Sequence, residues 1–573
     1  MKKYNIYFNF LKTFCLILVL TLILVGCKKE YKKDTRTECE KNGHTWVDAT
    51  YDEAKHCSVC GITEGEPLEP ELTKHLILDS NGNYGGTTNR SKYGYGAPLN
   101  GEYDNLDTPY YLLTDYYYMK STNTRTIFSK FSPYQQTMAD SGGIACALMV
   151  LNYLGEDVNK TYTEVNLVNR YEELMNQQVY KNGTTPEGLV KLMTNIGYKA
   201  EEVNYLELAS TTMQKIADFN DWVKETIDAG KFIFVRYQDT MDYGWHVIIG
   251  YDSMGTEYAK DDVLILADPF DNADHYQDGY SVVPTGRFYR WWLNVDKAGN
   301  TVDKFSGIVV TPKTQIEFTR VNETPKNTQV VPERHLLLNP DGSFGGTRDA
   351  SKYGTIPEKN GETDHLTSVY HKFVDYYNMT SSGTRYILTN YMAFQQTMAS
   401  SCGICSTMSV LNYYGEDISK YDEVWLTDKY CEVNGKDTIK NVGVGSGGLN
   451  KLVAVLGYNS EARSYSKANY VNESSMVFDT YEKFQAWVVK NLEKGTPMPV
   501  SWRPQGGHWE VIIGYDSMGN DNPYDDVIVL ADSHDTFDHY QDGYNTLPAY
   551  LFFRQWYNGS FTYNQQYNIF DRK

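Results

Sequence analysis

The stretch Phe394-Gln-Gln-Thr-Met-Ala-Ser-Ser-Cys402-Gly-Ile-Cys-Ser-Thr-Met-Ser-Val-Leu-Asn-Tyr-Tyr-Gly415 is informative because the chain contains it twice. The earlier copy is Tyr134-Gln-Gln-Thr-Met-Ala-Asp-Ser-Gly142-Gly-Ile-Ala-Cys-Ala-Leu-Met-Val-Leu-Asn-Tyr-Leu-Gly155, at an offset of 260 residues (402 − 142). The copies differ where a nucleophile would stand, since Cys402 is matched by Gly142. Glycine has no side chain that could attack a substrate. The repeat therefore predicts one working site and one that has lost its chemistry.

The duplication extends well beyond this stretch. His75–Thr87 matches His335–Thr347, and Val247–Gly255 matches Val511–Gly519 at an offset of 264 (511 − 247). A chain of 573 residues is also too long for one hydrophobic core. We expect a signal peptide (1–26), a tether (27–38), a small Cys/His module (39–66), a degenerate repeat (71–310), a linker (311–333) and an active repeat (334–573).

The composition limits the possible partners. The formal net charge is −20 and the isoelectric point is near 5.1, which argues against a nucleic-acid partner and against a basic membrane-binding face. Hydrophobic residues make up 41% of the chain, enough for folded cores. The 49 tyrosines are first of all good strand formers, and they also suit surfaces that bind peptides or sugars.

The N-terminus has the character of an export signal. Lys2 and Lys3 precede an apolar run, Phe14–Val25, which is short for a membrane-spanning helix. The run is followed by Gly26-Cys27 and resembles the lipobox of bacterial lipoproteins. The resemblance implies that Cys27 carries diacylglycerol and that the protein is extracytoplasmic, lipid-anchored to the bacterial cell membrane. An uncleaved membrane anchor would give the same location.

A compact group of cysteines and histidines follows the tether. The spacing Cys-x4-His, then Cys-x2-Cys, supplies four ligands for a tetrahedral structural zinc: Cys39, His44, Cys57 and Cys60. The group resembles small Cys/His ribbon modules. A disulfide is the alternative, but it leaves one of the three cysteines unpaired and does not explain His44.

The second repeat has the layout of an α+β domain. Apolar residues recur at helical spacing after Cys402, which places the cysteine in the first turn of a helix, and a second helix is expected at Phe484–Leu492. Runs rich in β-branched and aromatic residues predict strands at Pro499–Arg503, Trp509–Tyr515 and Val527–Asp532. We therefore expect two tandem α+β domains, each with helices and an antiparallel sheet.

Four residues of the second repeat have complementary chemical roles. A helix N-terminus favours the thiolate form of Cys402. His508 could lower the pKa of the thiol further and later protonate a leaving amine. Asp532, at the end of the next strand, could orient the ring of His508, and Gln396 could donate its amide to an oxyanion. Singly, each residue has an ordinary structural explanation.

In this order and context, Gln396, Cys402-Gly403, His508-Trp509 and Asp532 resemble papain-like cysteine peptidases, in particular the bacteriocin-leader-processing group. The resemblance covers roughly residues 390 to 545. It implies a papain-like fold and cleavage of a peptide or protein substrate through a thioester, with no catalytic cofactor. Ser533-His534 departs from the family, which usually has proline and an aromatic residue there.

The first repeat lacks more than the cysteine. Gly244 aligns with His508, and the nearest histidine, His246, aligns with Glu510. Two residues along a strand correspond to roughly 7 Å, so we expect the His246 ring to lie too far away for the same hydrogen bond. Gln136 and Asp268 persist. These features predict a pseudoenzyme repeat.

Three other functions stay open at this stage. Both repeats could present aromatic binding grooves, with a vestigial catalytic set. The chemistry could instead be hydrolysis of peptidoglycan amides or acyl transfer. Cys402 and Cys405 also form a Cys-x-x-Cys pair, but the βαβ pattern of a thioredoxin-like redox site is missing, and we expect Cys405 in the core.

Overall fold

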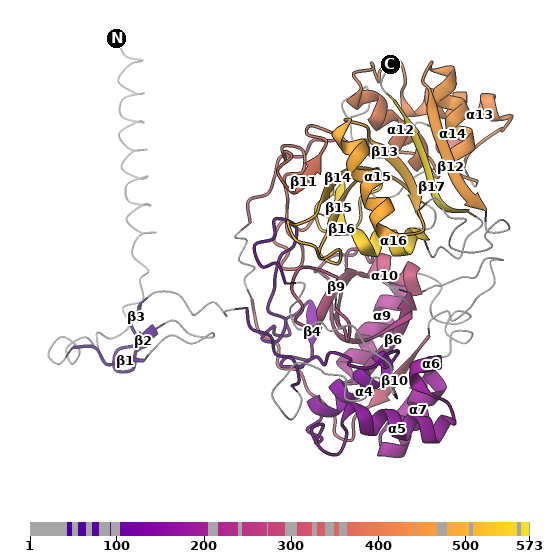
Figure 1. Cartoon of the computed structure of the whole chain (residues 1–573). Helices are drawn as coiled ribbons and strands as arrows, with labels where there is room; N and C mark the ends of the chain where they lie inside the picture. The colour runs from indigo at the N-terminus through magenta and orange to yellow at the C-terminus, as the bar shows by residue number, and fades with distance from the viewer. Residues whose placement is uncertain are drawn as a thin grey trace, which may run out of the picture. The chain divides into compact units, whose positions relative to one another are not determined.

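The computed structural model describes residues 43–47, 55–64, 72–78, 92, 104–203, 216–238, 243–271, 273–292, 306–323, 329–337, 349–354, 364–440, 442–466, 478–502, 508–557 and 563–571. The chain divides into two compact units, Met1–Thr73 and Lys74–Lys573. The described part of the smaller unit is a three-stranded antiparallel sheet of β1 (Trp46–Val47), β2 (Lys55–Cys57) and β3 (Thr63–Glu64). Both repeats lie in the larger unit (Figure 1).

Each repeat has one seven-stranded antiparallel sheet with helices packed against it. In the first repeat the order is β5-β10-β6-β7-β8-β9 with β4 beside β7, and in the second β12-β17-β13-β14-β15-β16 with β11 beside β14. The first-repeat strands are β4 (Arg125–Ile127), β5 (Lys199–Glu202), β6 (Phe232–Gln238), β7 (Tyr243–Asp252), β8 (Val263–Ala267), β9 (Tyr280–Pro284) and β10 (Gly307–Thr311). Those of the second are β11 (Arg385–Ile387), β12 (Ser460–Ser466), β13 (Met498–Trp502), β14 (His508–Asp516), β15 (Val527–Asp532), β16 (Tyr544–Pro548) and β17 (Tyr563–Phe570).

The helices repeat in the same way. The first repeat has α4 (Gly142–Tyr153), α5 (Glu164–Met175), α6 (Val179–Asn182), α7 (Pro186–Ile196), α9 (Ile216–Asp228) and α10 (Thr285–Trp292). The second has α11 (Ala350–Tyr353), α12 (Cys402–Tyr413), α13 (Glu423–Asn434), α14 (Ser446–Val455), α15 (Tyr481–Glu493) and α16 (Ala549–Tyr557). The predicted α+β class and the predicted elements of the second repeat are confirmed, with boundaries shifted by up to three residues.

The central strand β14 positions the site. All nine of its residues are buried, which requires cover on both faces, and α12 and α15 pack against it. Gly403 permits the close approach of α12: an added Cβ would lie 2.3 Å from Val444 Cγ2 and 3.0 Å from Trp509 Cδ1. The start of α12 is therefore held beside the start of β14.

Two segments cross between the repeats. We call residues 104–120 the first arm and 364–380 the second arm. Tyr110 of the first arm is buried in the core of the second repeat, and its hydroxyl donates to Asp516 Oδ2 at 2.7 Å. Tyr370 of the second arm makes the equivalent bond to Asp252 Oδ2 in the first repeat, also at 2.7 Å. The repeats are thus joined reciprocally, in the manner of a domain-swapped dimer.

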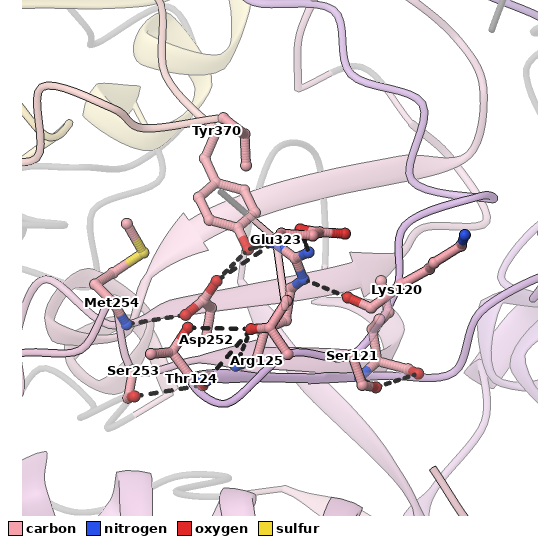
Figure 2. Close-up of polar contacts among 12 residues, drawn as sticks. Lys120, Ser121, Thr124, Arg125, Asp252, Ser253, Met254, Glu323 and Tyr370 are labelled. Carbon is pink, nitrogen blue, oxygen red and sulfur yellow. Dashed lines mark hydrogen bonds and ion pairs between the residues drawn. The ribbon is translucent and has the colours of Figure 1, made fainter. Parts of the chain in front are cut away.

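The expected linker 311–333 takes part in this junction. Figure 2 shows Arg125 of β4 between Asp252, Tyr370 and Glu323, a residue of the linker segment. Arg125 is 5% exposed, and its Nη2 lies 2.5 Å from Glu323 Oε2. Gln329, further along the linker, donates to the carbonyls of Ser368 and His371 in the second arm. The described parts of the linker are therefore packed against both repeats.

Candidate active site

Cys402 is the first residue of α12, as the sequence predicts. It is 8% exposed and is a free thiol. The first backbone N–H groups of a helix have no partner within the helix and carry partial positive charge. Cys402 therefore stands at the end of α12 where these N–H groups lie.

His508 and Asp532 form a buried pair. His508 Nε2 lies 2.5 Å from Asp532 Oδ1, and the two side chains are 8% and 0% exposed. Burial opposes the charge on His508, but Asp532, and after it Cys402, raise the pKa of the imidazole well above its ordinary value of 6.5. Burial likewise opposes the charge on Asp532, but His508 lowers the pKa of the carboxyl. Each partner thus favours the charged form of the other, and Cys402 is the other hydrogen-bonding partner of the ring.

Gln396 lies beside the position of the nucleophile. Its Nε2 donates to the Met398 carbonyl at 3.2 Å, and its Oε1 accepts from Ser533 Oγ at 3.0 Å. In the first repeat, a Cβ added to Gly142 would lie 3.0 Å from Gln136 Oε1. The glutamine is therefore held next to the start of the helix, and one N–H of its amide is engaged with backbone. Ser533, the departure from the usual sequence, contributes to holding it.

A second carboxylate, Glu510, stands on the same strand as His508. It is 0% exposed and lies opposite Asp532 in the β14–β15 register. One ligand atom from each of His508, Glu510 and Asp532 lies within 4.8 Å of the others. A second histidine, His534, lies in the turn after β15. Its backbone N–H donates to Asp532 Oδ1 at 2.7 Å, and its ring is centred 6.2 Å from that of His508.

Glu423 organises the segment that leads to Cys402, and sequence analysis missed it. Its carboxylate accepts from Thr397 N at 3.1 Å, from Thr397 Oγ1 at 2.5 Å and from Ser401 Oγ at 2.6 Å. The Cys405 thiol, in the core as expected, lies 3.3 Å from it. Glu164 makes the same contacts with Thr137 and Ser141 in the first repeat. In both repeats the dipeptide Glu-Val directly follows the N-cap residue of a helix, and this shared dipeptide is the sequence signal that could have identified the glutamate.

Replacing Glu423 by glutamine is expected to lower the free energy of unfolding by about 2 kcal/mol, because the amide NH2 replaces one carboxylate oxygen and cannot accept from the buried hydroxyl that donates to it. Urea denaturation measures this loss. Glu164→Gln is the matched control: it should cost similar stability, but only Glu423→Gln should also slow alkylation of Cys402. Equal effects of the two variants on alkylation would contradict the positioning role of Glu423.

In the first repeat, one expectation is wrong. His246 is not too far from the aspartate: its Nε2 lies 3.3 Å from Asp268 Oδ2, and both side chains are buried. The β7–β8 register pairs Val247 with Ala267, so His246 and Asp268 directly follow this pair, whereas His508 reaches Asp532 diagonally from two residues before Glu510. A histidine at either of these two positions of the neighbouring strand can therefore reach a carboxylate at the end of the strand. The first repeat therefore keeps a His–Asp pair but has Gly142 in place of the nucleophile.

Comparison with known proteins finds the same duplication. Residues 128–300 and 388–564 each match the Peptidase_C39 like family. The chain belongs to this family. None of the curated proteins compared matches the chain. The second Peptidase_C39-like repeat contains Gln396, Cys402, His508 and Asp532, and the first contains Gly142. The family supports the papain-like cysteine peptidase fold expected from the sequence.

The N-terminal Cys/His cluster lies outside both Peptidase_C39-like repeats. Ligand atoms of His44, Cys57 and Cys60 lie within 4.8 Å of one another, and Cys60 Sγ is 3.4 Å from His44 Nδ1. Burial acts to raise the pKa of Cys57, but the backbone at Cys60 and Val59 and the side chain of His44 lower it to about 5. These three residues fit a tetrahedral thiolate–imidazole site. Cys39, the fourth expected ligand, and Cys27, the expected lipidation site, lie outside the described residues.

Proposed function

We propose that the chain is a surface-anchored cysteine peptidase whose second repeat cleaves peptide amide bonds. The observation that carries the proposal is the buried His508–Asp532 pair, with Nε2 2.5 Å from Oδ1, whose ring also hydrogen-bonds Cys402 at a helix N-terminus. A free thiol, an imidazolium and an orienting carboxylate in this order are what acyl transfer to sulfur requires.

The reaction follows from these groups. The Cys402 thiolate attacks the amide carbonyl, and Gln396 and the Cys402 backbone N–H stabilise the resulting oxyanion. His508 gives its proton to the amine nitrogen as the C–N bond breaks, which leaves a thioester on Cys402. A water molecule, deprotonated by His508, then attacks the thioester and releases the carboxylic acid. Sulfur leaves as a thiolate, and the imidazolium is restored.

Parallel assays on peptides and on purified cell wall test the substrate class. We expect the mature protein to cleave peptides, with an acyl adduct on Cys402 detectable by mass spectrometry, and Cys402→Ala to be inactive. Release of free amines from cell wall, with peptides left intact, would show that the enzyme is a cell-wall amide hydrolase and not a peptidase. Incorporation of an added amine in place of water would indicate acyl transfer. Binding of peptides without formation of a covalent adduct would indicate a binding protein that has no catalytic activity.

The first repeat is proposed to be a pseudoenzyme. Gly142 at the start of α4 and Gly244 in β7 stand where the second repeat has Cys402 and His508. Its His246–Asp268 pair is buried without a sulfur at the helix start. The first repeat retains the fold and exchanges arms with the second. These two features favour a role in which the first repeat supports the active one.

The pH dependence should depend on Asp532. Because the pKa of His508 is raised above 6.5, the imidazolium form persists above that pH and is lost as the pH rises through the raised value. Asp532→Asn removes the charge that raises it and leaves the burial that lowers it. The imidazolium proton is needed by the leaving amine, so we expect the alkaline limb of kcat/KM for amide cleavage to move down by about one pH unit or more. Asp268→Asn, the control in the first repeat, should leave the limb in place. An unmoved limb in Asp532→Asn would refute the pairing.

Surface anchoring is proposed to occur through Cys27. Within the parts of the chain that the structure describes, no helix has the length and apolar character to cross a bilayer. Mass spectrometry of the mature N-terminal peptide should show a diacylglycerol-modified Cys27. Cys27→Ser should release the protein from membranes; retention of that variant at the membrane would favour an uncleaved anchor.

The Cys/His module is proposed to hold one structural zinc through Cys39, His44, Cys57 and Cys60. Metal analysis of the reduced, mature chain should find about one zinc per chain. Cys60→Ser should abolish it, and Cys431→Ser, a buried cysteine of the second repeat, should not. A metal-free protein with Cys57 and Cys60 joined as a disulfide would remove this site. Loss of the zinc should leave alkylation of Cys402 unchanged.

A further inference from the structure

A cavity of about 160 Å³ lies between the two repeats. It is lined by β9 and β16, the last strands of the two sheets, and by residues of both arms. Among the residues that the structure describes, Cys402, His508 and Asp532 do not line it. An engineered cavity of similar volume in another protein binds benzene, so this one has room for about six non-hydrogen atoms. The cavity is therefore distinct from the site of Cys402.

Three polar side chains that line the cavity have atoms that make no hydrogen bond within the described part of the chain. Asn545 of β16 is 2% exposed, and both its Oδ1 and its Nδ2 lack a partner there. The same holds for the buried hydroxyl of Tyr111 in the first arm and for Nε2 of His371 in the second arm. Buried polar groups in proteins are nearly always hydrogen-bonded, and a buried amide without partners is unfavourable. These atoms therefore indicate a polar occupant of the cavity.

The two halves of the cavity differ, although the fold is repeated. Asn545 corresponds to Ser281 and Arg287 of α10 corresponds to Leu551, both at an offset of 264 (545 − 281 and 551 − 287). The second repeat thus contributes an amide where the first has a small hydroxyl, and the first contributes a guanidinium where the second has an apolar side chain. A guanidinium and an amide NH2 both donate hydrogen bonds, and the guanidinium fork matches a carboxylate. These differences favour an occupant rich in acceptors.

Two basic side chains line the cavity, Arg287 and Lys372. Burial lowers the pKa of Arg287 and carboxylates of the second repeat raise it, but a guanidinium keeps its proton in proteins. Burial also lowers the pKa of Lys372, and Asp107 raises it. His371 is neutral, because burial, and after it the charge of Arg287, lower its pKa to about 3.

The acidic side chains that line the cavity are partly neutralised. Asp268 is paired with His246, with Oδ2 3.3 Å from Nε2. Burial raises the pKa of both Asp274 and Asp538 to about 7, so about half of each is protonated near neutral pH. A protonated carboxyl adds no charge and can donate a hydrogen bond. The lining therefore favours an anionic occupant.

We propose that this cavity binds a small carboxylate, of the size of acetate or of a free amino acid such as alanine, held by Arg287 and Asn545. A carboxylate has two oxygens that can accept from the guanidinium, from Asn545 Nδ2 and from the Tyr111 hydroxyl together. The ligand contacts both repeats, so its binding stabilises their junction by mass action. This site is independent of the peptidase chemistry proposed for Cys402.

Calorimetric titration and thermal unfolding of the full mature chain test this site, with acetate and alanine as probes at constant ionic strength. Acetamide and ethylammonium, which are similar in size but neutral and cationic, are the control ligands. At least one of the two carboxylates should bind saturably and raise the unfolding temperature, and neither control ligand should. Binding of ethylammonium instead, or no binding of any probe, would overturn the proposal; the second result would indicate a cavity filled by water.

Variants locate the binding in the cavity. Asn545→Asp is nearly isosteric and places a carboxylate against the ligand, and Arg287→Leu removes the cation by installing the residue of the second repeat. Each should weaken carboxylate binding by at least about tenfold. Asn491→Asp introduces the same charge in α15, at a described residue that does not line the cavity, and should leave the affinity unchanged.

Unchanged affinity in folded Asn545→Asp or folded Arg287→Leu would contradict the proposal. If neither variant folds, Tyr111→Phe, which removes a single oxygen atom, decides: weaker binding supports the site and unchanged binding contradicts it. Cys402→Ala should bind the probes as the wild type does. Failure of the peptidase assignment and failure of this binding site are therefore seen in separate measurements.

Discussion

Replacing Cys402 by alanine is expected to lower kcat/KM for amide cleavage by about 10⁴-fold or more, because no other group at the site can form the acyl intermediate. The protein should stay folded, since only one sulfur atom is removed, at the first residue of α12. Initial rates on the best peptide substrate, compared with the uncatalysed reaction, measure the loss.

Cys405→Ala is the matched control for this variant. Cys405 lies one helical turn further along α12, is 0% exposed and contacts Glu423. It should affect stability more than rate, with kcat/KM reduced by less than about tenfold. Loss of activity in Cys405→Ala together with full activity in Cys402→Ala would reject the assignment of the nucleophile.

Replacing His508 by alanine is expected to lower kcat by a similar factor, about 10⁴, because it removes the group that activates the thiol and protonates the leaving amine. It should also abolish the acceleration of Cys402 alkylation at pH values below that of an ordinary thiol's pKa. Single-turnover kinetics and the alkylation profile together measure the effect.

Two histidines serve as controls for this variant. His246→Ala removes the equivalent partner of Asp268 in the first repeat, and His534→Ala removes the ring centred 6.2 Å from that of His508. Neither should lower kcat by more than about tenfold. A loss in His534→Ala that equals the loss in His508→Ala would show that the base has been misassigned.

Much of the second repeat could be predicted because its signals are local. The helix begins at Cys402, and the strand Val527–Asp532 has the predicted bounds. Gly142 and Gly244, aligned with Cys402 and His508, predict a degenerate first repeat from the alignment of the two repeats alone. Periodicity and residue chemistry suffice for such features because they are determined within one element.

What could not be predicted depends on pairing between elements. His246 reaches Asp268 because of strand register, which spacing along one strand does not reveal. The exchange of Tyr110 and Tyr370 between repeats requires knowledge of how the two domains pack.

The rate of Cys402 alkylation at pH 6, relative to an unperturbed thiol under the same conditions, tests the account most directly. An unperturbed cysteine has a pKa near 8.5 and is almost fully protonated at that pH. We predict that Cys402 reacts at least about tenfold faster and that His508→Ala removes the difference. A Cys402 that reacts no faster than the unperturbed thiol would contradict the ion pair, and with it the catalytic role of the second repeat.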